Sequence, residues 1–323
     1  MSTSHLASPH PGSKPASEHA APRVKSLELY DDPHSEYSAK VKVALFAKGL
    51  AWAPLPLPCG TTRSPEFRAV NPLGKIPALR VTFEDGRSEL LIESEVILEF
   101  LEDAFPDAPR LLPADPLARS KARLVSRYHD LYLEPALRRL YPQVAPSVRD
   151  ERLVQEAVAG FKERMAELAA LLPPVAADDG ADGSSTSSSP GSSSSAFALG
   201  QLQPGGGLGL GDCAYPALLL YAELILPLLD LEPAAGAGAG AGAGPGKNPL
   251  TMGSGGEGHQ LEALLGSEGT GRLEGGRGMG AVYRAHPRLW AWRQALWGHP
   301  AVQAVFAELQ PAAEEWVAMK LQQ

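Results

Sequence analysis

Residues 71–105, NPLGKIPALRVTFEDGRSELLIESEVILEFLEDAF, decide the fold of the first half of the chain. Apolar runs at residues 76–81 and 90–92 predict two strands, and EDGR at residues 84–87 predicts the turn between them. Residues 94–105 then repeat apolar side chains at helical spacing, so they predict an amphipathic helix. The stretch therefore predicts a β-hairpin that runs directly into a helix.

The residues before this stretch extend the same unit towards the N-terminus. Residues 26–30 and 52–57 predict strands, and residues 37–48 between them have helical spacing. Gly49 follows as the stop signal of that helix. The order strand, helix, strand, hairpin, helix is typical of a small α/β sandwich, which we expect over residues 26–106.

The second half of the chain has a different character. After a proline-punctuated connector, the strand signals end and only helical patterns remain. The longest patterns cover residues 117–141, 148–172, 210–229 and 289–309. We therefore expect an all-helical domain over residues 116–323.

Three stretches rich in glycine, alanine, serine or proline bury too little apolar surface to fold. Disorder is expected in an N-terminal extension at residues 1–25 and in insertions at about 173–207 and about 232–281. The glycine-rich run at residues 274–285 is assigned to a linker. Long surface insertions cost little closure entropy, so the helices around them can still pack together.

Charge and cysteine content narrow the classes of partner. The chain carries 29 Lys and Arg against 37 Asp and Glu without a basic stripe, so no nucleic-acid partner is expected. Cys59 and Cys213 lie far apart and outside any Cys/His cluster, so no metal site is expected. A reduced, intracellular setting follows, with a single disulfide as the alternative.

The most apolar segment does not predict a membrane span. Residues 214–229 contain Glu223 and are shorter than the ~20 residues that cross a bilayer, so a buried helix and no membrane partner are expected. The N-terminal ~24 residues lack the apolar centre of a secretory signal. A cytoplasmic location is expected, with an organelle transit peptide as the weaker alternative.

Three separated motifs resemble the glutathione S-transferase superfamily. They are NPLGKIPAL at residues 71–79, IES at residues 92–94 with its helix, and LGLGDCA at residues 208–214. The resemblance implies an α/β thioredoxin-like N-terminal domain and an all-α C-terminal helical domain. Gly209 replaces the hydroxyl of the family's helix-capping box, and Asp212 is expected to serve stability and not chemistry.

The resemblance also implies residues that bind glutathione. The family has a cis peptide bond before the proline of the first motif, which presents the Ile76 backbone beside Pro77 to the cysteinyl segment. A plain turn proline is the alternative. Glu93 is expected to bind the γ-glutamyl ammonium, and Ser94 with the helix N-terminus its carboxylate. Simple helix capping by Ser94 is compatible with that role.

Two cations and three aromatic side chains complete the expected site. Lys75 and Arg63 are candidates for binding the glycyl carboxylate of glutathione, with solvated surface charges as the alternative. Tyr128, His129 and Tyr132 fall on one predicted helix and are candidates for a hydrophobic-substrate pocket. Aromatic residues at helical spacing also form cores, which is the alternative for these three.

The alignment on KVKVAL at residues 40–45 places Ser35 at the catalytic position of serine-type members. Its hydroxyl is expected to donate to the glutathione thiolate, assisted by the dipole of the helix that follows. The chain lacks the proline that commonly comes next, so Tyr37 and Ser38 are alternative donors. Tyr30 is less favoured, and a role of Ser35 as a helix cap alone is the remaining alternative.

The resemblance implies a glutathione S-transferase that stabilises the thiolate for attack on a small hydrophobic electrophile. The resemblance implies a role in detoxification. It also implies a homodimer that uses glutathione as co-substrate and no metal. One alternative is a non-catalytic glutathione-binding or assembly module of the same fold. Another is a glutathione-dependent isomerase such as maleylacetoacetate isomerase, whose Ser-Ser-Cys run this chain lacks. The absence of cysteine at position 35 argues against thiol-transferase chemistry.

Overall fold

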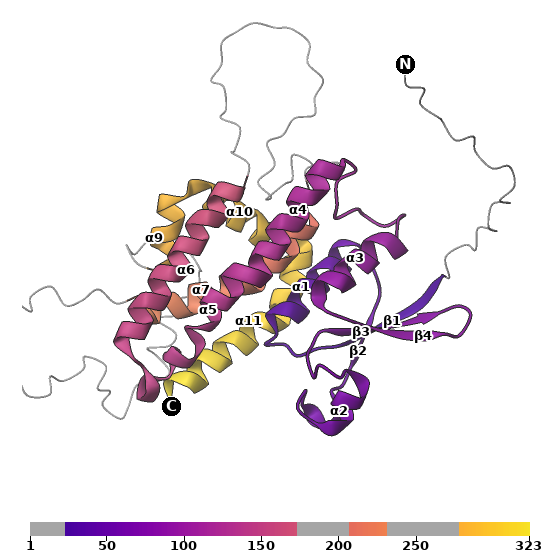
Figure 1. The fold of residues 1–323 in the computed structure, drawn as a ribbon, viewed down its shortest axis with the longest axis horizontal. Helices are drawn as coiled ribbons and strands as arrows, with labels where there is room; N and C mark the ends of the chain where they lie inside the picture. The colour runs from indigo at the N-terminus through magenta and orange to yellow at the C-terminus, as the bar shows by residue number, and fades with distance from the viewer. Residues whose placement is uncertain (1–22, 173–206, 231–277) are drawn as a thin grey trace, which may run out of the picture.

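The computed structural model describes residues 23–172, 207–230 and 278–323 (Figure 1). Its N-terminal half contains a four-stranded sheet in the order β2-β1-β3-β4. The strands are β1 (Val24–Tyr30), β2 (Ala53–Leu55), β3 (Ala78–Phe83) and β4 (Ser88–Ile92). β1 pairs with β2 in parallel, and β3 pairs antiparallel with both β1 and β4. The predicted hairpin is therefore confirmed.

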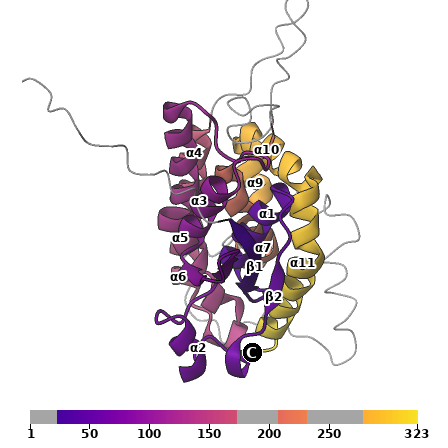
Figure 2. The same cartoon turned by 90° about the vertical axis from the view of Figure 1, so that its right-hand side faces the viewer.

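Helices cover both faces of this sheet. They are α1 (Glu36–Ala47), α2 (Pro65–Val70) and α3 (Ser94–Ala104), with a short turn η1 (Pro58–Gly60) before α2. Neighbouring side chains of β1 point to opposite faces: Leu29 joins the core shared with α1 and α3, whereas Tyr30 packs against Phe67 of α2. As a result α1 and α3 lie between the sheet and the C-terminal helices (Figures 1 and 2).

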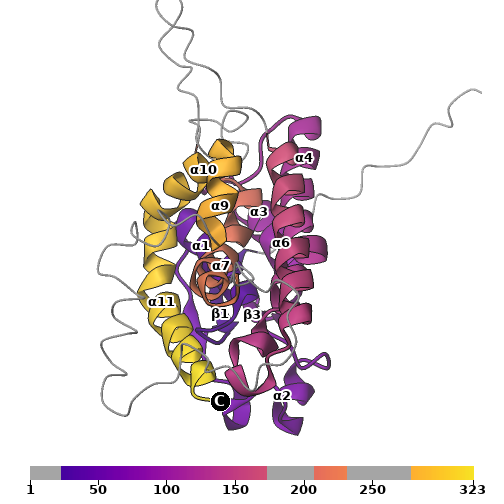
Figure 3. The ribbon, with the colours of Figure 1, turned by 90° about the vertical axis from the view of Figure 1, so that its left-hand side faces the viewer.

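The C-terminal half contains helices and no described strand. Its longer helices are α4 (Pro116–Tyr128), α5 (Glu134–Arg138), α6 (Glu151–Leu171), α7 (Tyr215–Leu229), α9 (Gly278–Ala285), α10 (Pro287–Gly298) and α11 (Pro300–Leu321). Its short turns are η2 (His129–Leu133), η3 (Tyr141–Val144), η4 (Pro146–Val148) and η7 (Leu210–Ala214). In Figure 3, α7 runs through the middle of the bundle, with α6, α9 and α11 around it.

The central helix explains the most apolar part of the sequence. Leu210–Leu229, formed by η7 and α7, is long and apolar enough to cross a membrane by length and composition. However, 83% of its apolar window is buried inside the bundle. The prediction of a buried helix is confirmed for this segment.

Two long helical patterns are interrupted by proline. The pattern at residues 117–141 divides into α4 and α5 around the π-type turn η2, because Pro135 has no N–H to continue the α-helical ladder. The pattern at residues 289–309 divides at Pro300, which starts α11 behind the capping residue His299.

Two expected disordered stretches are wrong at their edges. Strand β1 already begins at Val24, inside the stretch 1–25. Helix α9 begins at Gly278, inside both the stretch 232–281 and the assigned linker. The helix forms there because its N-terminus contacts the other helices of the bundle. The Gly278 N–H donates to Asp230 at 2.7 Å, and Met279 is buried. The other residues of the three stretches lie outside the described residues, apart from Arg23 and Gly207, which are in neither helix nor strand.

Candidate active site

Two neighbouring cavities lie between the sheet domain and the helical half. The first has a volume of about 720 Å³ and the second about 250 Å³. Tyr37, Lys75 and Ile76 line both cavities, so the two adjoin at the start of α1 and the loop before β3. The lining of the first cavity includes residues 34–37 of the sheet domain and Glu134, Arg138 and Tyr141 of the helical half, so the cavity needs both halves of the chain.

Ser35 lies at the point where this cavity meets the N-terminus of α1. It is the capping residue of α1, and its Oγ accepts a hydrogen bond from the Ser38 N–H at 3.1 Å. That bond uses a lone pair of the oxygen, so the hydroxyl can still donate its own hydrogen. The helix N-terminus adds a positive partial charge beside the cavity. Ser35 can therefore cap the helix and stabilise an anion at the same time.

The alternative hydroxyl donors are placed differently. Tyr37 lines both cavities, but its hydroxyl donates to Glu134 at 3.3 Å, and burial among carboxylates raises its pKa. Ser38 is completely buried and lies in the lining of neither cavity. The Tyr30 hydroxyl accepts a hydrogen bond from Arg80 on the side of the sheet that α2 covers. The geometry therefore favours Ser35 among these four.

The loop before β3 forms the opposite wall. Its Ile76–Pro77 peptide bond is cis, as the first motif predicts. The Asn71 side chain holds the loop, because its amide donates to the Lys75 carbonyl at 2.7 Å and its oxygen accepts the Leu73 N–H at 3.0 Å. Gly74 has a φ of 60°, a left-handed conformation that glycine adopts easily. These contacts place Lys75, Ile76 and Pro77 on the lining of the second cavity.

The second cavity also brings together the IES motif and two residues of the helical half. Glu93 has a φ of 69° and lines the cavity beside Ser94, the first residue of α3. Arg127 and Asp130 approach from α4 and η2, and their side chains form an ion pair at 3.0 Å. The sequence analysis missed both residues, although Asp130 directly follows one of its candidates. The cavity therefore offers both signs of charge to a zwitterionic group.

Arg63 lies apart from the residues that line these cavities. Its side chain is exposed, and only its neighbours Thr61 and Thr62 reach the lining of the first cavity. Lys75, by contrast, lines both cavities. The structure therefore brings Lys75 and not Arg63 into the site.

The three aromatic candidates do not line either cavity. The Tyr128 hydroxyl donates to the Arg164 carbonyl at 3.0 Å, so this ring packs towards α6. His129 is completely buried, and desolvation lowers its pKa. Tyr132 is 51% exposed and stacks on Tyr128 with ring centroids 5.2 Å apart. Tyr128 and His129 therefore belong to the core, which is the alternative given for them, and Tyr132 lies at the surface.

Residues that the sequence analysis did not select form the far wall of the first cavity. They are Glu36, Glu134, Arg138 and Tyr141. Arg138 forms an ion pair with Glu134, and the Tyr141 hydroxyl donates to Glu36. Glu36 is 5% exposed, and desolvation by burial raises its pKa to about 7, although the Tyr141 hydrogen bond opposes the shift. An acidic side chain directly after the capping serine was the only sequence signal for this cluster.

The raised pKa of Glu36 predicts a stability that depends on pH. The ordinary pKa of 4.5 applies to the unfolded chain and about 7 to the folded one, so the folded state binds more protons between these values. The free energy of unfolding therefore falls as pH rises through this window, by up to ~3 kcal/mol at ~1.4 kcal/mol per pKa unit. Glu36→Gln cannot ionise and is expected to be ~3 kcal/mol more stable than the native chain at pH 8 but equal at pH 4.

Urea unfolding of both proteins at the two pH values measures this difference. Glu156→Gln, on the exposed surface of α6, is the control and should gain nothing at pH 8. A pH-independent difference for Glu36→Gln would contradict the prediction.

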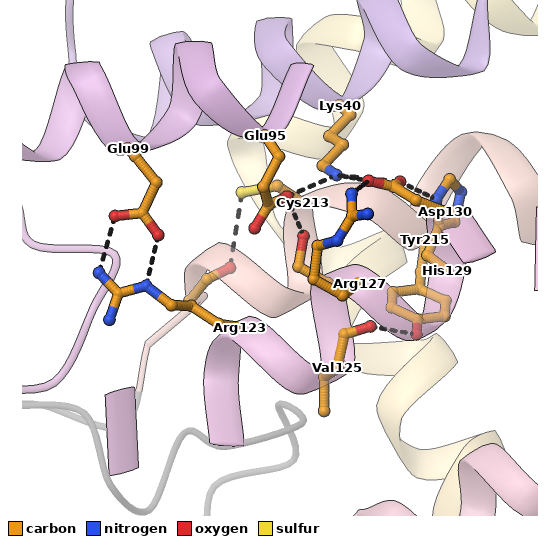
Figure 4. A network of polar contacts seen from close by, with 12 residues as sticks. Lys40, Glu95, Glu99, Arg123, Val125, Arg127, His129, Asp130, Cys213 and Tyr215 are labelled. Atoms are coloured by element: carbon orange, nitrogen blue, oxygen red, sulfur yellow. Dashed lines mark hydrogen bonds and ion pairs between the residues drawn. The ribbon is translucent and has the colours of Figure 1, made fainter. Parts of the chain in front are cut away.

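A network of charged side chains includes Asp130, which lines the second cavity (Figure 4). The Lys40 ammonium of α1 contacts Glu95 of α3 at 2.8 Å and Asp130 of η2 at 3.1 Å. His129 Nδ1 and Arg127 also contact Asp130, and the Ser126 hydroxyl donates to Glu95 at 2.6 Å. The network joins the first helix of the sheet domain to the helical half and thereby fixes how the two walls of the site face each other.

Comparisons with known proteins agree with this architecture. Residues 29–109 match the family described as glutathione S-transferase, N-terminal domain. The maleylacetoacetate isomerase of Pseudomonas aeruginosa is 41% identical over 104 residues, which cover 31% of this chain and 47% of that protein. The zeta-class glutathione S-transferase of Euphorbia esula is 38% identical over 96 residues, covering 29% and 40%. The chain thus spans about half the length of the curated relatives that it matches.

The fold extends beyond the matched sequence. The crystal structure of rice GST1 in complex with glutathione has a TM-score of 0.56 at 22% identity, covering 91% of this chain and 96% of that one. A tau-class glutathione S-transferase from mango, Mangifera indica, has a TM-score of 0.55 at 19% identity, covering 90% and 96%. Both contain the same fold. Residues 29–109 of this chain therefore form a glutathione S-transferase N-terminal domain with a cis proline corner, and the helical second half completes the fold of these transferases.

Proposed function

We propose that the chain is a glutathione transferase that uses Ser35 to stabilise the glutathione thiolate. The observation that carries the proposal is the position of Ser35 at the N-terminus of α1, on the lining of a cavity whose opposite wall is the Lys75–Ile76 corner. A hydroxyl donor and a helix dipole both favour a thiolate over a thiol, whose ordinary pKa is ~8.5. The thiolate then attacks an electrophile, and Ser35 forms no covalent bond.

The two cavities suggest how the co-substrates divide the site. The γ-glutamyl end of glutathione is assigned to the second cavity, with its ammonium at Glu93 or Asp130 and its carboxylate at Ser94 and the N-terminus of α3. Lys75 is placed to bind the glycyl carboxylate. The electrophile is assigned to the part of the first cavity lined by residues 134–141. A homodimer in the cytoplasm is part of the proposal.

An isomerase is the second candidate, and a specific observation favours it. The maleylacetoacetate isomerase of Pseudomonas aeruginosa is 41% identical to the matched segment of this chain. Isomerisation and conjugation share the thiolate and differ in the second substrate. The discriminating experiment offers the purified protein a chloro-nitroaromatic and maleylacetoacetate, each with glutathione. Conjugation alone supports the transferase and isomerisation alone the isomerase, whereas binding of glutathione without either supports a non-catalytic module.

Ser35→Ala tests the assigned donor. The variant loses one hydrogen bond to the thiolate, and turnover with glutathione is expected to fall ~10 to 100-fold. The fold should remain intact, because a lost helix cap costs only ~1 kcal/mol. Steady-state kinetics and a titration of the bound thiol measure both effects. Ser120→Ala, on the exposed side of α4, is the control. Unchanged turnover and an unchanged thiol titration in Ser35→Ala would move the role to another residue.

A further inference from the structure

The Glu36 carboxyl is a buried acidic group in the wall of the first cavity. It directly follows Ser35 in the sequence and belongs to the same cavity lining. Its Oε1 accepts the Tyr141 hydroxyl, whereas its Oε2 is buried and has no hydrogen-bond partner among the described residues. Buried polar atoms without partners are rare and costly. Glu36, a residue of the cavity lining, therefore keeps one carboxylate oxygen that is free to accept a proton.

The groups around Glu36 compensate its negative charge only in part. It is faced by Tyr37 of α1, Glu134 and Arg138 of α5, Tyr141 of η3 and Tyr221 of α7. Arg138, the one cation among these five, forms its ion pair with Glu134. The ionised form of Glu36 is therefore the disfavoured one, and the cavity favours a proton on this carboxyl.

We propose that Glu36 accepts the thiol proton when glutathione binds, so that the proton stays inside the site and does not pass to solvent. The inference rests on the proposed function, because Ser35 is what locates the sulfur beside Glu36. It makes Glu36 a catalytic residue for the activation step, with Tyr141 as the residue that positions its carboxyl.

The step balances within the site. The S–H bond of glutathione breaks, and its electron pair remains on the sulfur as the thiolate. The proton forms a bond with Glu36 Oε2, and the Ser35 hydroxyl donates to the thiolate. The cavity loses the charge of one carboxylate and gains the charge of one thiolate, so its net charge does not change.

The acidity of the two groups is matched to this transfer. Burial raises the Glu36 pKa to about 7, which is close to the ~8.5 of a free thiol. A new negative charge on the nearby sulfur raises the affinity of Glu36 for a proton further, since like charges disfavour ionisation. Ser35 and the helix N-terminus stabilise the thiolate at the same time. Stabilisation of the thiolate by these donors therefore drives the transfer from sulfur to carboxylate, and the like-charge repulsion then disfavours loss of the proton from Glu36 to solvent.

Counting the protons released on binding tests the proposal. Isothermal titration calorimetry of the full chain at pH 8, in two buffers of different ionisation enthalpy, gives the number of protons released per glutathione bound. S-methylglutathione has no thiol proton, so subtracting its value removes protons from other groups. The ultraviolet absorbance of the thiolate gives the fraction of bound thiol that is ionised. At pH 8 a carboxyl with a pKa of about 7 is ~90% ionised and ready to accept.

The native chain is expected to form the thiolate while releasing fewer than ~0.2 protons to the buffer, because only ~10% of Glu36 is already protonated. Glu36→Gln, which has no acceptor, is expected to release about 0.8 proton per glutathione bound as thiolate, because roughly a quarter of a free thiol with a pKa of ~8.5 is already ionised at pH 8. Glu156→Gln, on the exposed surface of α6, leaves every group of the cavity in place and should behave as the native chain does.

Release of about 0.8 proton per glutathione bound as thiolate by the native chain would overturn the proposal. So would a thiolate in Glu36→Gln that forms without proton release, or binding of glutathione by the native chain without a thiolate. An absence of any binding heat with both glutathione and S-methylglutathione is a different result. It would overturn the proposed glutathione-binding function itself.

Discussion

Asp212→Ala is expected to lower the free energy of unfolding by about 3–5 kcal/mol, more than the loss of an exposed helix cap. Asp212 is 1% exposed, and its carboxylate accepts the Gly209 N–H at 2.7 Å and the Trp292 indole N–H at 2.6 Å. Bonds to a charged group contribute ~1.5–3 kcal/mol each, and removing the acceptor leaves two buried donors unsatisfied. Through these two hydrogen bonds, the carboxylate links the start of the central helix to α10.

Urea unfolding of the native chain and the variant measures this loss. Asp150→Ala is the matched control, because Asp150 also caps a helix by accepting the Leu153 N–H, but at an exposed position. That variant should lose only ~1 kcal/mol. If Asp212→Ala costs no more than Asp150→Ala, the buried contact with Trp292 contributes nothing.

Lys40→Met should destabilise the chain by a similar amount, about 3–5 kcal/mol. The Lys40 ammonium is fully buried between the carboxylates of Glu95 and Asp130, which are 16% and 10% exposed. Methionine keeps the apolar stem but removes the charge, so both carboxylates lose their shared cation inside the protein. Breaking a buried ion pair from one side costs ~3–5 kcal/mol, because the remaining charge stays desolvated.

The matched control breaks an exposed pair. Arg152→Met removes the partner of Glu156 on α6, where the two side chains are 77% and 51% exposed, and should cost less than ~1 kcal/mol. The double variant Lys40→Met/Glu95→Gln should recover part of the lost free energy of unfolding, since it removes one of the two buried carboxylates that Lys40→Met leaves without a cation. Equal urea midpoints for Lys40→Met and the native chain would contradict the role of the network.

Local patterns predicted most of the elements. The hairpin and helix of residues 78–104 follow from alternation and helical spacing, which depend on neighbours in the chain. The IES motif and the cis proline corner lie within about twenty residues of each other, and the structure places both on one cavity. The central helix could be predicted as buried because of its composition alone. None of these features requires a contact between distant segments.

The misplaced features depend on distant contacts or on local turns that helical spacing does not predict. Helix α9 exists because its glycine-rich start binds Asp230 and packs on α7, and the local sequence resembles a linker. Arg63 and the aromatic candidates were selected by charge and spacing, but the direction in which they point is set by η2 and by the loop around Thr61. Spacing on one helix does not tell which side faces a cavity formed by another.

The amino-acid sequence by itself determined the α/β domain and the helical domain, and it predicted the NPLGKIPAL and IES motifs and Ser35 as candidates for binding glutathione. Tertiary structure alone decided which hydroxyl reaches the cavity, and it brought Glu36 together with Tyr141, 105 residues away in the chain. It also enclosed both in a space that raises the Glu36 pKa. The physical reason is that propensity and capping act between near neighbours, whereas desolvation and charge pairing depend on whatever the folded chain brings within a few ångströms.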